Sequence, residues 1–333
     1  KEEKERAPPP PPFDMLDIPE GMDAMGYTYA AYCARRWFNG RAHVIADESQ
    51  DRAPKAFLDE GKFKLEWIRK FGAVQKRFDH LVAIKSDAEE NIYNKKAREV
   101  LVKKLNAFLA HPNHLFSGVL DTISICAQDV QELHERFQFQ LINVSSLDVL
   151  DSIGAVRSAF SDVYLGGNAL SMNDLAASLA NFNFYAAVAT AKIVNYRYNR
   201  YDFERLLQCA RPLVDVTHIY VYAKDTYSFN DGGGAISQYL GHWNKSGVII
   251  ALNSVVAEQI SKLAVGDKRI VEFERGDRPR FSPSVSGENP VDVKNGLRNS
   301  DVFYPVRNRD FNRWRAAKGR GGALAHVLFV GPP

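Results

Sequence analysis

The sequence predicts an α+β protein in which a helical N-terminal half packs on a mainly antiparallel sheet from the C-terminal half. In the first half, apolar residues recur every three or four positions, which is the spacing of helices. From residue 182 onward the pattern changes to alternation and to the aromatic and β-branched runs typical of strands. The segments lack the regular strand–helix–strand order of a parallel sheet, so antiparallel pairing is expected.

Residues 1–17 differ in composition from the rest of the chain. A charged stretch leads into five prolines, Pro8–Pro12, which favour an extended polyproline conformation and cannot donate backbone hydrogen bonds. We expect residues 1–17 to be a tether and residues 18–333 to form one globular unit, with a soft boundary near residue 180.

The first predicted helix begins at Ile18 and ends at Gly40. Met22, Met25 and Trp37 recur on one of its faces, and glycine is a common helix stop. The other predicted helices cover residues 97–108, 128–135, 149–163 and 311–317.

The predicted strands are short, and most lie in the second half of the chain. Residues 275–300 are rich in Gly, Pro, Ser, Asp and Asn, which predicts a long surface loop. The strands cover residues 63–67, 137–141, 184–198, 216–222, 247–252, 269–273 and 324–330.

The composition excludes several classes of protein. A formal net charge of +3 is too small to indicate a nucleic-acid partner. The sequence has no run of the roughly 18 apolar residues that a membrane-spanning helix needs, so no transmembrane segment is expected. Cys33, Cys126 and Cys209 are widely separated and odd in number, which predicts free thiols in a cytoplasmic producer. Dinucleotide, P-loop and serine-hydrolase motifs are absent.

Polar and titratable residues gather after the strand that ends at Lys224. If that strand pairs with one that starts near Gly247, the side chains after it converge at one end of a sheet. Asp225 or His242 would act as a general base, and Tyr227 would be a phenol donor. Asp225 and Asp231 are carboxylates suited to Mg²⁺. Asn230, Trp243 and Asn244 complete the candidate site as substrate-binding residues.

The same residues also have a structural interpretation. Asn, Asp and Gly are the residues that hairpin loops use. Tyr227 and Phe229 alternate as core positions would, and Trp243 fits a core aromatic whose indole nitrogen caps a loop. The sequence alone leaves both interpretations open.

Three blocks of sequence resemble a bacterial family known as Domain of Unknown Function 6402. The first contains Asp17-Ile18-Pro19, Met25-Gly26 and Arg36-Trp37-Phe38, and the second contains Val221-Tyr222, Asp225–Phe229 and Leu240–Asn244. The third contains Tyr304-Pro305-Val306, Asn308, Asp310-Phe311, Trp314-Arg315 and Gly321-Gly322. Members of that family are often encoded near type VI secretion spike and toxin genes. The resemblance therefore implies a secreted effector, or its accessory, in bacterial competition.

A local similarity points to one chemistry. Asp225-x-Tyr227 resembles the Asp-x-Tyr-Asp signature of colicin M-like bacteriocins, which cleave a lipid-linked peptidoglycan precursor with Mg²⁺. Ser228 stands in this chain where that signature has its second Asp.

Two hypotheses follow. The first is an antibacterial effector that hydrolyses a cell-envelope or phosphate-containing substrate, with an immunity protein as its partner. The second is a non-catalytic adaptor or accessory protein that binds a secretion spike or a partner effector. In both, the chain is made in the cytoplasm of the producer and delivered to a target cell.

Overall fold

The structure, a computed structural model, describes residues 13–41, 52–110, 117–149, 173–229, 237–249, 271–274, 291–295, 299–319 and 326–330. Contacts divide the chain into two units, each built from separate segments. Unit 1 comprises residues 1–47, 146–180 and 227–326, and unit 2 comprises residues 48–145, 181–226 and 327–333. One division falls between Ala180 and Asn181, near the soft boundary that the sequence suggested. A single globular unit over 18–333 stays a prediction.

Several helices of unit 1 pack on α2 (Thr28–Asn39). Its N-terminus is capped from far along the chain, because the Asp174 carboxylate accepts hydrogen bonds from the backbone nitrogens of Tyr29 at 3.1 Å and Ala30 at 2.8 Å. The bounds are α1 (Asp17–Ala24), α2 (Thr28–Asn39), α8 (Ser146–Val149), α10 (Asp174–Ser178) and α12 (Asn308–Ala317).

Unit 1 also contains a five-stranded sheet in the order β7-β6-β10-β9-β8. Its pairs are antiparallel except for β8 with β9. Helix α1 packs closely on the turn between β6 and β7, where a Cβ added at Gly21 would lie 2.4 Å from the Asn244 carbonyl oxygen. The strands are β6 (Tyr239–Asn244), β7 (Gly247–Ile249), β8 (Val271–Glu274), β9 (Val291–Asn295) and β10 (Asn299–Arg307).

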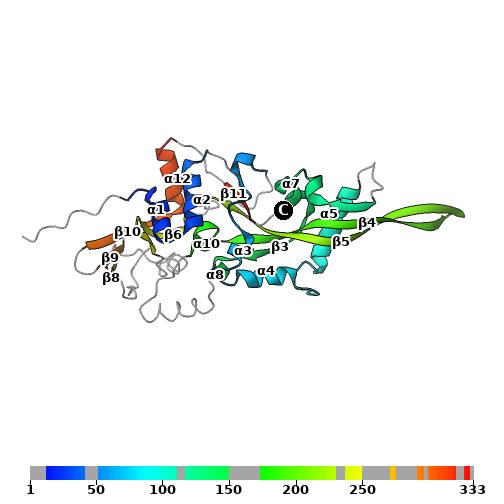
Figure 1. Cartoon of the computed structure of the whole chain (residues 1–333), viewed down its shortest axis with the longest axis horizontal. Helices are drawn as coiled ribbons and strands as arrows, with labels where there is room; N and C mark the ends of the chain where they lie inside the picture. The colour runs from blue at the N-terminus through cyan, green and yellow to red at the C-terminus, as the bar shows by residue number, and fades with distance from the viewer. Residues whose placement is uncertain are drawn as a thin grey trace, which may run out of the picture. The chain divides into compact units, whose positions relative to one another are not determined.

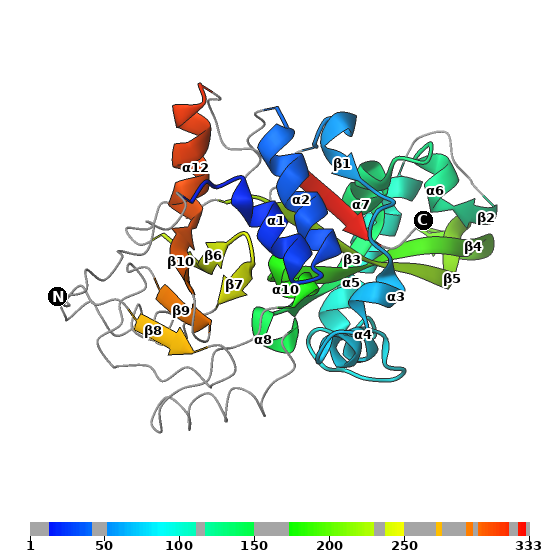
Figure 2. The same cartoon turned by 60° about the vertical axis from the view of Figure 1, so that its left-hand side comes forward.

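Unit 2 is a six-stranded sheet flanked by helices. The sheet order is β1-β11-β5-β4-β2, with β3 also paired to β4 (Figure 2). Its strands are β1 (Leu58–Asp59), β2 (Gly118–Asp121), β3 (Gln138–Val144), β4 (Phe182–Asp202), β5 (Arg205–Tyr227, of which residues up to Thr226 belong to this unit) and β11 (His326–Val330, from Val327). Its helices are the 3-10 turn η1 (Lys55–Phe57), α3 (Leu65–Ile68), α4 (Val74–Val82), α5 (Lys95–Leu109), α6 (Thr122–Ile125) and α7 (Val130–Phe137).

Strands β4 and β5 form a long hairpin that continues past the rest of unit 2. Strand β2 pairs with β4 only as far as Ile193. Beyond it, nine residue pairs join β4 to β5, from Val194 with Leu213 to Asp202 with Arg205. Figure 1 shows this ribbon projecting beyond α5 and α7. We call residues 194–213 the arm.

The predicted α+β class, with helices early and antiparallel sheets in the C-terminal half, is confirmed. The predicted first helix is interrupted, because Gly26 adopts a positive φ of 77° between α1 and α2. The predicted strand at 63–67 is wrong, since residues 65–68 form α3. The predicted loop at 275–300 contains β9 and the start of β10.

The predicted tether falls mostly outside the described residues. Of residues 1–17, the structure describes Phe13 onward. The ring of Phe13 stacks on that of Tyr304, with centroids 5.4 Å apart. Part of the predicted tether therefore packs within unit 1.

Candidate functional site

The structure assigns the predicted site residues to two different units. Asp225 belongs to unit 2, whereas Tyr227, His242, Trp243 and Asn244 belong to unit 1. Asn230 and Asp231 lie outside the described residues. The strand pairing that would join these residues is also different from the prediction. Asp225 lies within β5, which continues past the predicted end at Lys224 and pairs with β4, whereas the strand at Gly247 pairs with β6. Convergence of the candidate residues stays a prediction.

Tyr227 lies in an aromatic core. Its side chain is only 7% exposed, and its ring meets that of Phe229 edge-to-face at 5.3 Å. Burial, together with a smaller effect of neighbouring Cys33, raises the pKa of Tyr227 well above its ordinary value. A phenol in this environment remains protonated, so it is suited to donating a hydrogen bond and not to acting as a base.

His242 and Trp243 are buried on β6. His242 is 0% exposed and Trp243 is 3% exposed. The indole nitrogen of Trp243 donates a hydrogen bond of 2.9 Å to the Leu240 carbonyl, which confirms the interpretation of Trp243 as a core aromatic that caps a local backbone group.

Asn244 stabilises the turn that follows β6. Its side-chain oxygen accepts a hydrogen bond of 2.7 Å from the Ser246 backbone nitrogen. This bond is the two-residue pattern by which Asn side chains stabilise turns. Lys245 in the same turn lies 3.5 Å from the Asp17 carboxylate, at the start of α1.

Residues from all three resemblance blocks meet in one aromatic cluster of unit 1, which we call the Trp37 cluster. The Trp37 ring, which is fully buried, contacts Phe229 at 5.1 Å and Phe311 at 5.2 Å, both edge-to-face. The rings of Phe229 and Phe311 stack at 3.6 Å with an interplanar angle of 8°. Phe38 meets Trp314 edge-to-face at 4.9 Å. Side chains separated by up to about 280 positions thus form one core.

A buried arginine completes the Trp37 cluster. Arg315 is 2% exposed, and its guanidinium lies 5.2 Å from the centre of the Trp37 ring. It donates hydrogen bonds to the carbonyls of Trp37 at 3.2 Å and Gly40 at 3.4 Å. These carbonyls belong to the last turn and the C-cap of α2, where a helix needs donors and favours positive charge. Arg315 therefore joins α12 to the end of α2.

Unit 2 contains a buried titratable cluster that the sequence did not indicate. His134 of α7 shares a hydrogen bond of 2.7 Å with the Tyr222 hydroxyl, and its ring meets that of Tyr185 edge-to-face at 4.8 Å. Burial, with smaller effects of the Lys224 and Lys104 cations, lowers the pKa of His134 to about 3. Burial also lowers the pKa of Lys224. The imidazole is therefore neutral at physiological pH and acts as a core hydrogen-bonding group.

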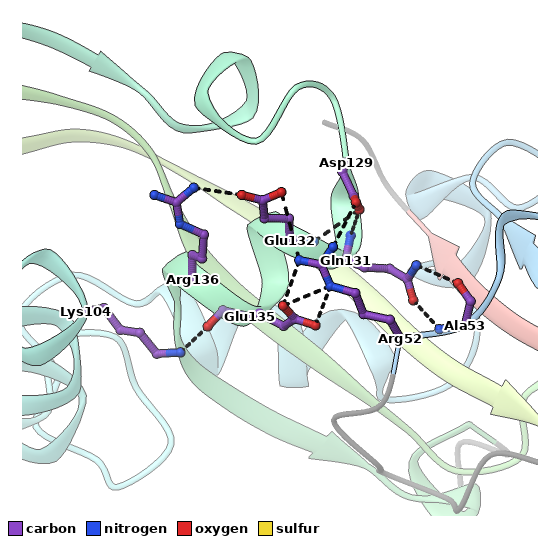
Figure 3. Close-up of polar contacts among 8 residues, drawn as sticks. All are labelled: Arg52, Ala53, Lys104, Asp129, Gln131, Glu132, Glu135 and Arg136. Atoms are coloured by element: carbon purple, nitrogen blue, oxygen red, sulfur yellow. Dashed lines mark hydrogen bonds and ion pairs between the residues drawn. The ribbon is translucent and has the colours of Figure 1, made fainter. Parts of the chain in front are cut away.

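An ion network anchors the segment before β1 to α7. Arg52 donates to both carboxylate oxygens of Glu135, with its Nε and one terminal nitrogen each at 2.9 Å from an oxygen (Figure 3). The same guanidinium lies 3.4 Å from Asp129. Gln131 exchanges two hydrogen bonds with the Ala53 backbone, at 2.7 and 2.8 Å. Each of these carboxylates faces a cation or a backbone donor, so the network is typical of a structural clamp.

Among the residues with described positions, no three His, Cys, Asp or Glu side chains lie close enough together to hold a metal ion. A magnesium site at Asp225 and Asp231 stays a prediction, because Asp231 is outside those residues. None of the described helices is long and apolar enough to cross a membrane.

The arm presents apolar side chains to solvent on both of its faces. Successive residues of a strand point to opposite faces, and cross-strand partners share a face. The first face contains Tyr196 and Tyr198, whose rings stack at 6.4 Å, and Arg211 lies over them at 5.7 and 5.8 Å. The second face contains Tyr201, which is 75% exposed and lies opposite Leu206.

The tip of the arm is an unusual turn. Phe203 and Glu204 have φ values of 44° and 68°, a conformation that two-residue hairpin turns fill with Asn-Gly or Asp-Gly. The Phe203 side chain is 97% exposed. A run rich in Ala, Val, Ile and Tyr predicted a strand over residues 184–198, but the sequence carried no signal that this strand would extend beyond the sheet.

The sequence model of one family matches residues 13–324, and that family is described as a family of unknown function (DUF6402). The comparisons found no match among the curated proteins or among the solved structures.

Proposed function

We propose that this chain, which belongs to the DUF6402 family, is a non-catalytic adaptor or accessory protein that binds a secretion spike or a partner effector of a type VI secretion system. One observation carries the binding role: unit 2 projects an arm with exposed apolar side chains on both faces, ending in a phenylalanine that is 97% exposed. The family resemblance supplies the type VI setting.

The chemistry of the described candidates in unit 1 also favours a binding protein. A general base must reach the proton that it removes. His242 is fully buried, and the Tyr227 phenol has a raised pKa within an aromatic core. Both side chains thus have the environment of core residues. In contrast, the exposed Tyr, Phe and Arg side chains of the arm are of the kind that protein interfaces bury.

We propose that the chain is made in the cytoplasm of the producer and leaves it bound to its partner. The test is to co-express the chain with each spike and effector protein encoded beside its gene, and to measure complexes by size-exclusion chromatography with light scattering. A stable complex of defined stoichiometry is expected. Failure to bind any of these proteins would overturn the adaptor role.

A second candidate is an antibacterial effector that hydrolyses an envelope or phosphate-containing substrate with Mg²⁺. The observation that favours it is Asp225, a half-buried carboxylate two residues before Tyr227 in a segment similar to colicin M-like bacteriocins. Its test is bacterial growth with the chain expressed in the cytoplasm or exported to the periplasm, with and without Asp225→Ala. Periplasmic killing that the substitution abolishes would favour this function; absence of killing would remove it.

A further inference from the structure

We propose that the arm inserts into a groove of a folded protein partner, whose walls are acidic and whose end holds an apolar pocket for Phe203. This inference rests on the proposed binding function and names the chemistry of the partner. It follows from the arm's apolar faces, charge, dimensions and tip.

Both faces of the arm carry exposed apolar side chains that a binding partner could bury. The first face exposes Val194, Tyr196, Tyr198, Leu207 and Leu213, and the second exposes Tyr201 and Leu206. A two-stranded hairpin is only marginally stable by itself in water. A partner that contacts one face would leave the apolar side chains of the other face in solvent. The presence of apolar side chains on both faces therefore favours a partner that surrounds the arm.

The net positive charge of the arm favours an acidic partner. Residues 194–213 contain four arginines, two acidic residues and no lysine. Asp202 lies directly opposite Arg205 in the register, so these two charges offset each other. The positive charges of Arg197, Arg200 and Arg211 are not offset in this way, and these arginines lie on both faces of the arm. Arginine forms paired hydrogen bonds with carboxylates and stacks on aromatic rings, which suits it to protein interfaces.

The dimensions of the arm favour a contact through both faces over a contact through one. Nine residue pairs at about 3.4 Å per residue give a length of about 30 Å, and two strands give a width of about 10 Å. One face thus covers about 300 Å², whereas a standard protein interface buries about 800 Å² on each partner. Two faces, two edges and the tip together approach that area.

The tip carries a residue that the turn itself disfavours. Left-handed backbone conformations cost a non-glycine residue about 1–2 kcal/mol. Phe203 and Glu204 both adopt them, and the Phe203 ring points into solvent. A large apolar side chain in this position contributes nothing to the hairpin, which is consistent with an anchor that fills a pocket in a partner.

Two other binding partners for the arm fit its side chains less well. A second copy of the arm would bring the same arginines together, and like charges across an interface are unfavourable. A membrane surface would receive Phe203 together with Glu204, whose carboxylate opposes insertion among anionic lipids. Both occupants are outcomes of the test below.

The first part of the test measures enclosure by thiol labelling, using the partner recovered by co-expression. Cys209 lies on the first face of the arm, opposite Tyr198. The double substitution Cys209→Ser with Asn199→Cys moves the accessible thiol to the second face. We expect the partner to protect both thiols from maleimide by about 10-fold or more in rate. Protection of one thiol alone would overturn enclosure.

The second part measures affinity with variants of matched chemistry. The double substitution Phe203→Asn with Glu204→Gly provides the preferred turn sequence and removes the ring, so the hairpin is kept while the anchor is lost. Arg197→Glu with Arg211→Glu reverses charge on both faces. Each is expected to weaken binding by about 10-fold or more. Ile84→Ser and Lys103→Glu, both exposed positions of unit 2 off the arm, are the controls and are expected to leave affinity unchanged.

The outcomes separate the two proposals. A complex that forms normally with all arm variants overturns the groove and leaves the adaptor role intact. Absence of any complex overturns the adaptor role itself. Dimers of the chain alone in sedimentation, or binding to phosphatidylglycerol vesicles, that depend on Phe203 would overturn the protein groove in favour of a second copy or a membrane.

Discussion

The Trp37 cluster of unit 1 and the arm of unit 2 use the same side-chain chemistry in opposite environments. In unit 1, the guanidinium of Arg315 lies 5.2 Å from the Trp37 ring, and both residues are buried. In the arm, Arg211 lies 5.7 Å from the exposed ring of Tyr196. The first pair joins segments that are far apart in the sequence, whereas the second lies within one hairpin.

This difference separates the region that can bind another molecule from the region that maintains the fold. The arginine over the buried indole is held in place by hydrogen bonds to two carbonyls at the end of α2. The arginine over the exposed tyrosines is solvated. A partner that replaces this solvent can bury the aromatic rings and pair with the arginine charge at the same place. The resemblance blocks that form the Trp37 cluster therefore maintain the fold.

The largest expected effect on stability comes from removing the central ring of the Trp37 cluster. Trp37→Ala removes a fully buried ring that contacts Phe38, Phe229 and Phe311, so it should lower the free energy of unfolding by about 3–5 kcal/mol. Urea denaturation followed by circular dichroism measures it. The matched change on the arm is Tyr196→Ala, for which a loss below about 1 kcal/mol is expected. Equal losses would remove the contrast between the two regions.

The second effect is a pH dependence of unit 2. The folded-state pKa of His134 is lowered to about 3 from an ordinary value of 6.5, so below pH 6.5 the unfolded chain binds a proton that the folded chain does not. Stability is full above pH 6.5 and falls as the pH drops toward 3, with a loss of about 3 kcal/mol at pH 4. His134→Gln should flatten this dependence in denaturation curves from pH 7 to 4. An unchanged slope would contradict the neutral buried imidazole.

A matched pair of arginine substitutions gives a smaller effect. Arg315→Met removes the donors that serve two carbonyls at the end of α2, so a loss of about 2 kcal/mol is expected. Arg211→Met removes an exposed contact, and its loss should be below about 0.5 kcal/mol. Thermal denaturation of both variants checks the difference. A reversed order would mean that the arm arginine supports the fold.

The smallest effect has the opposite sign. Phe203→Asn with Glu204→Gly places at both left-handed positions the residues that tolerate this conformation, so the chain should become more stable by about 1 kcal/mol. Hydrogen exchange of the arm amides measures the local gain. A loss of stability would indicate that the Phe203 ring packs within the chain.

Local patterns predicted several of the helices and strands, because the period of apolar residues depends on neighbours in sequence. The helix at 311–317 and the strand at 324–330 were predicted in this way and are confirmed as α12 and β11. The helix at 65–68 was predicted as a strand because Phe63, Leu65 and Trp67 alternate, and a segment this short has no second helical turn to reveal its period.

The site was harder to predict, because burial depends on elements far away in the sequence. Tyr227 and His242 have residue types typical of catalysis, and nothing in their own segments specifies that they lie in the interior. The arm has the same alternating pattern as a half-buried strand, and its exposure follows only from where β2 stops pairing with β4.

Thiol labelling of the folded chain without a partner tests most directly the contrast between the buried core of unit 1 and the solvent-exposed arm. Cys33 in the core of unit 1 and Cys126 in unit 2 are both fully buried, and burial raises the pKa of Cys126 to about 11. Cys209 on the arm is partly exposed. Intact mass spectrometry after brief maleimide treatment at pH 7 should show one adduct, located at Cys209 and absent from Cys209→Ser. Labelling of Cys33 at a comparable rate would contradict the account, because it would mean that the region around Tyr227 is open to solvent.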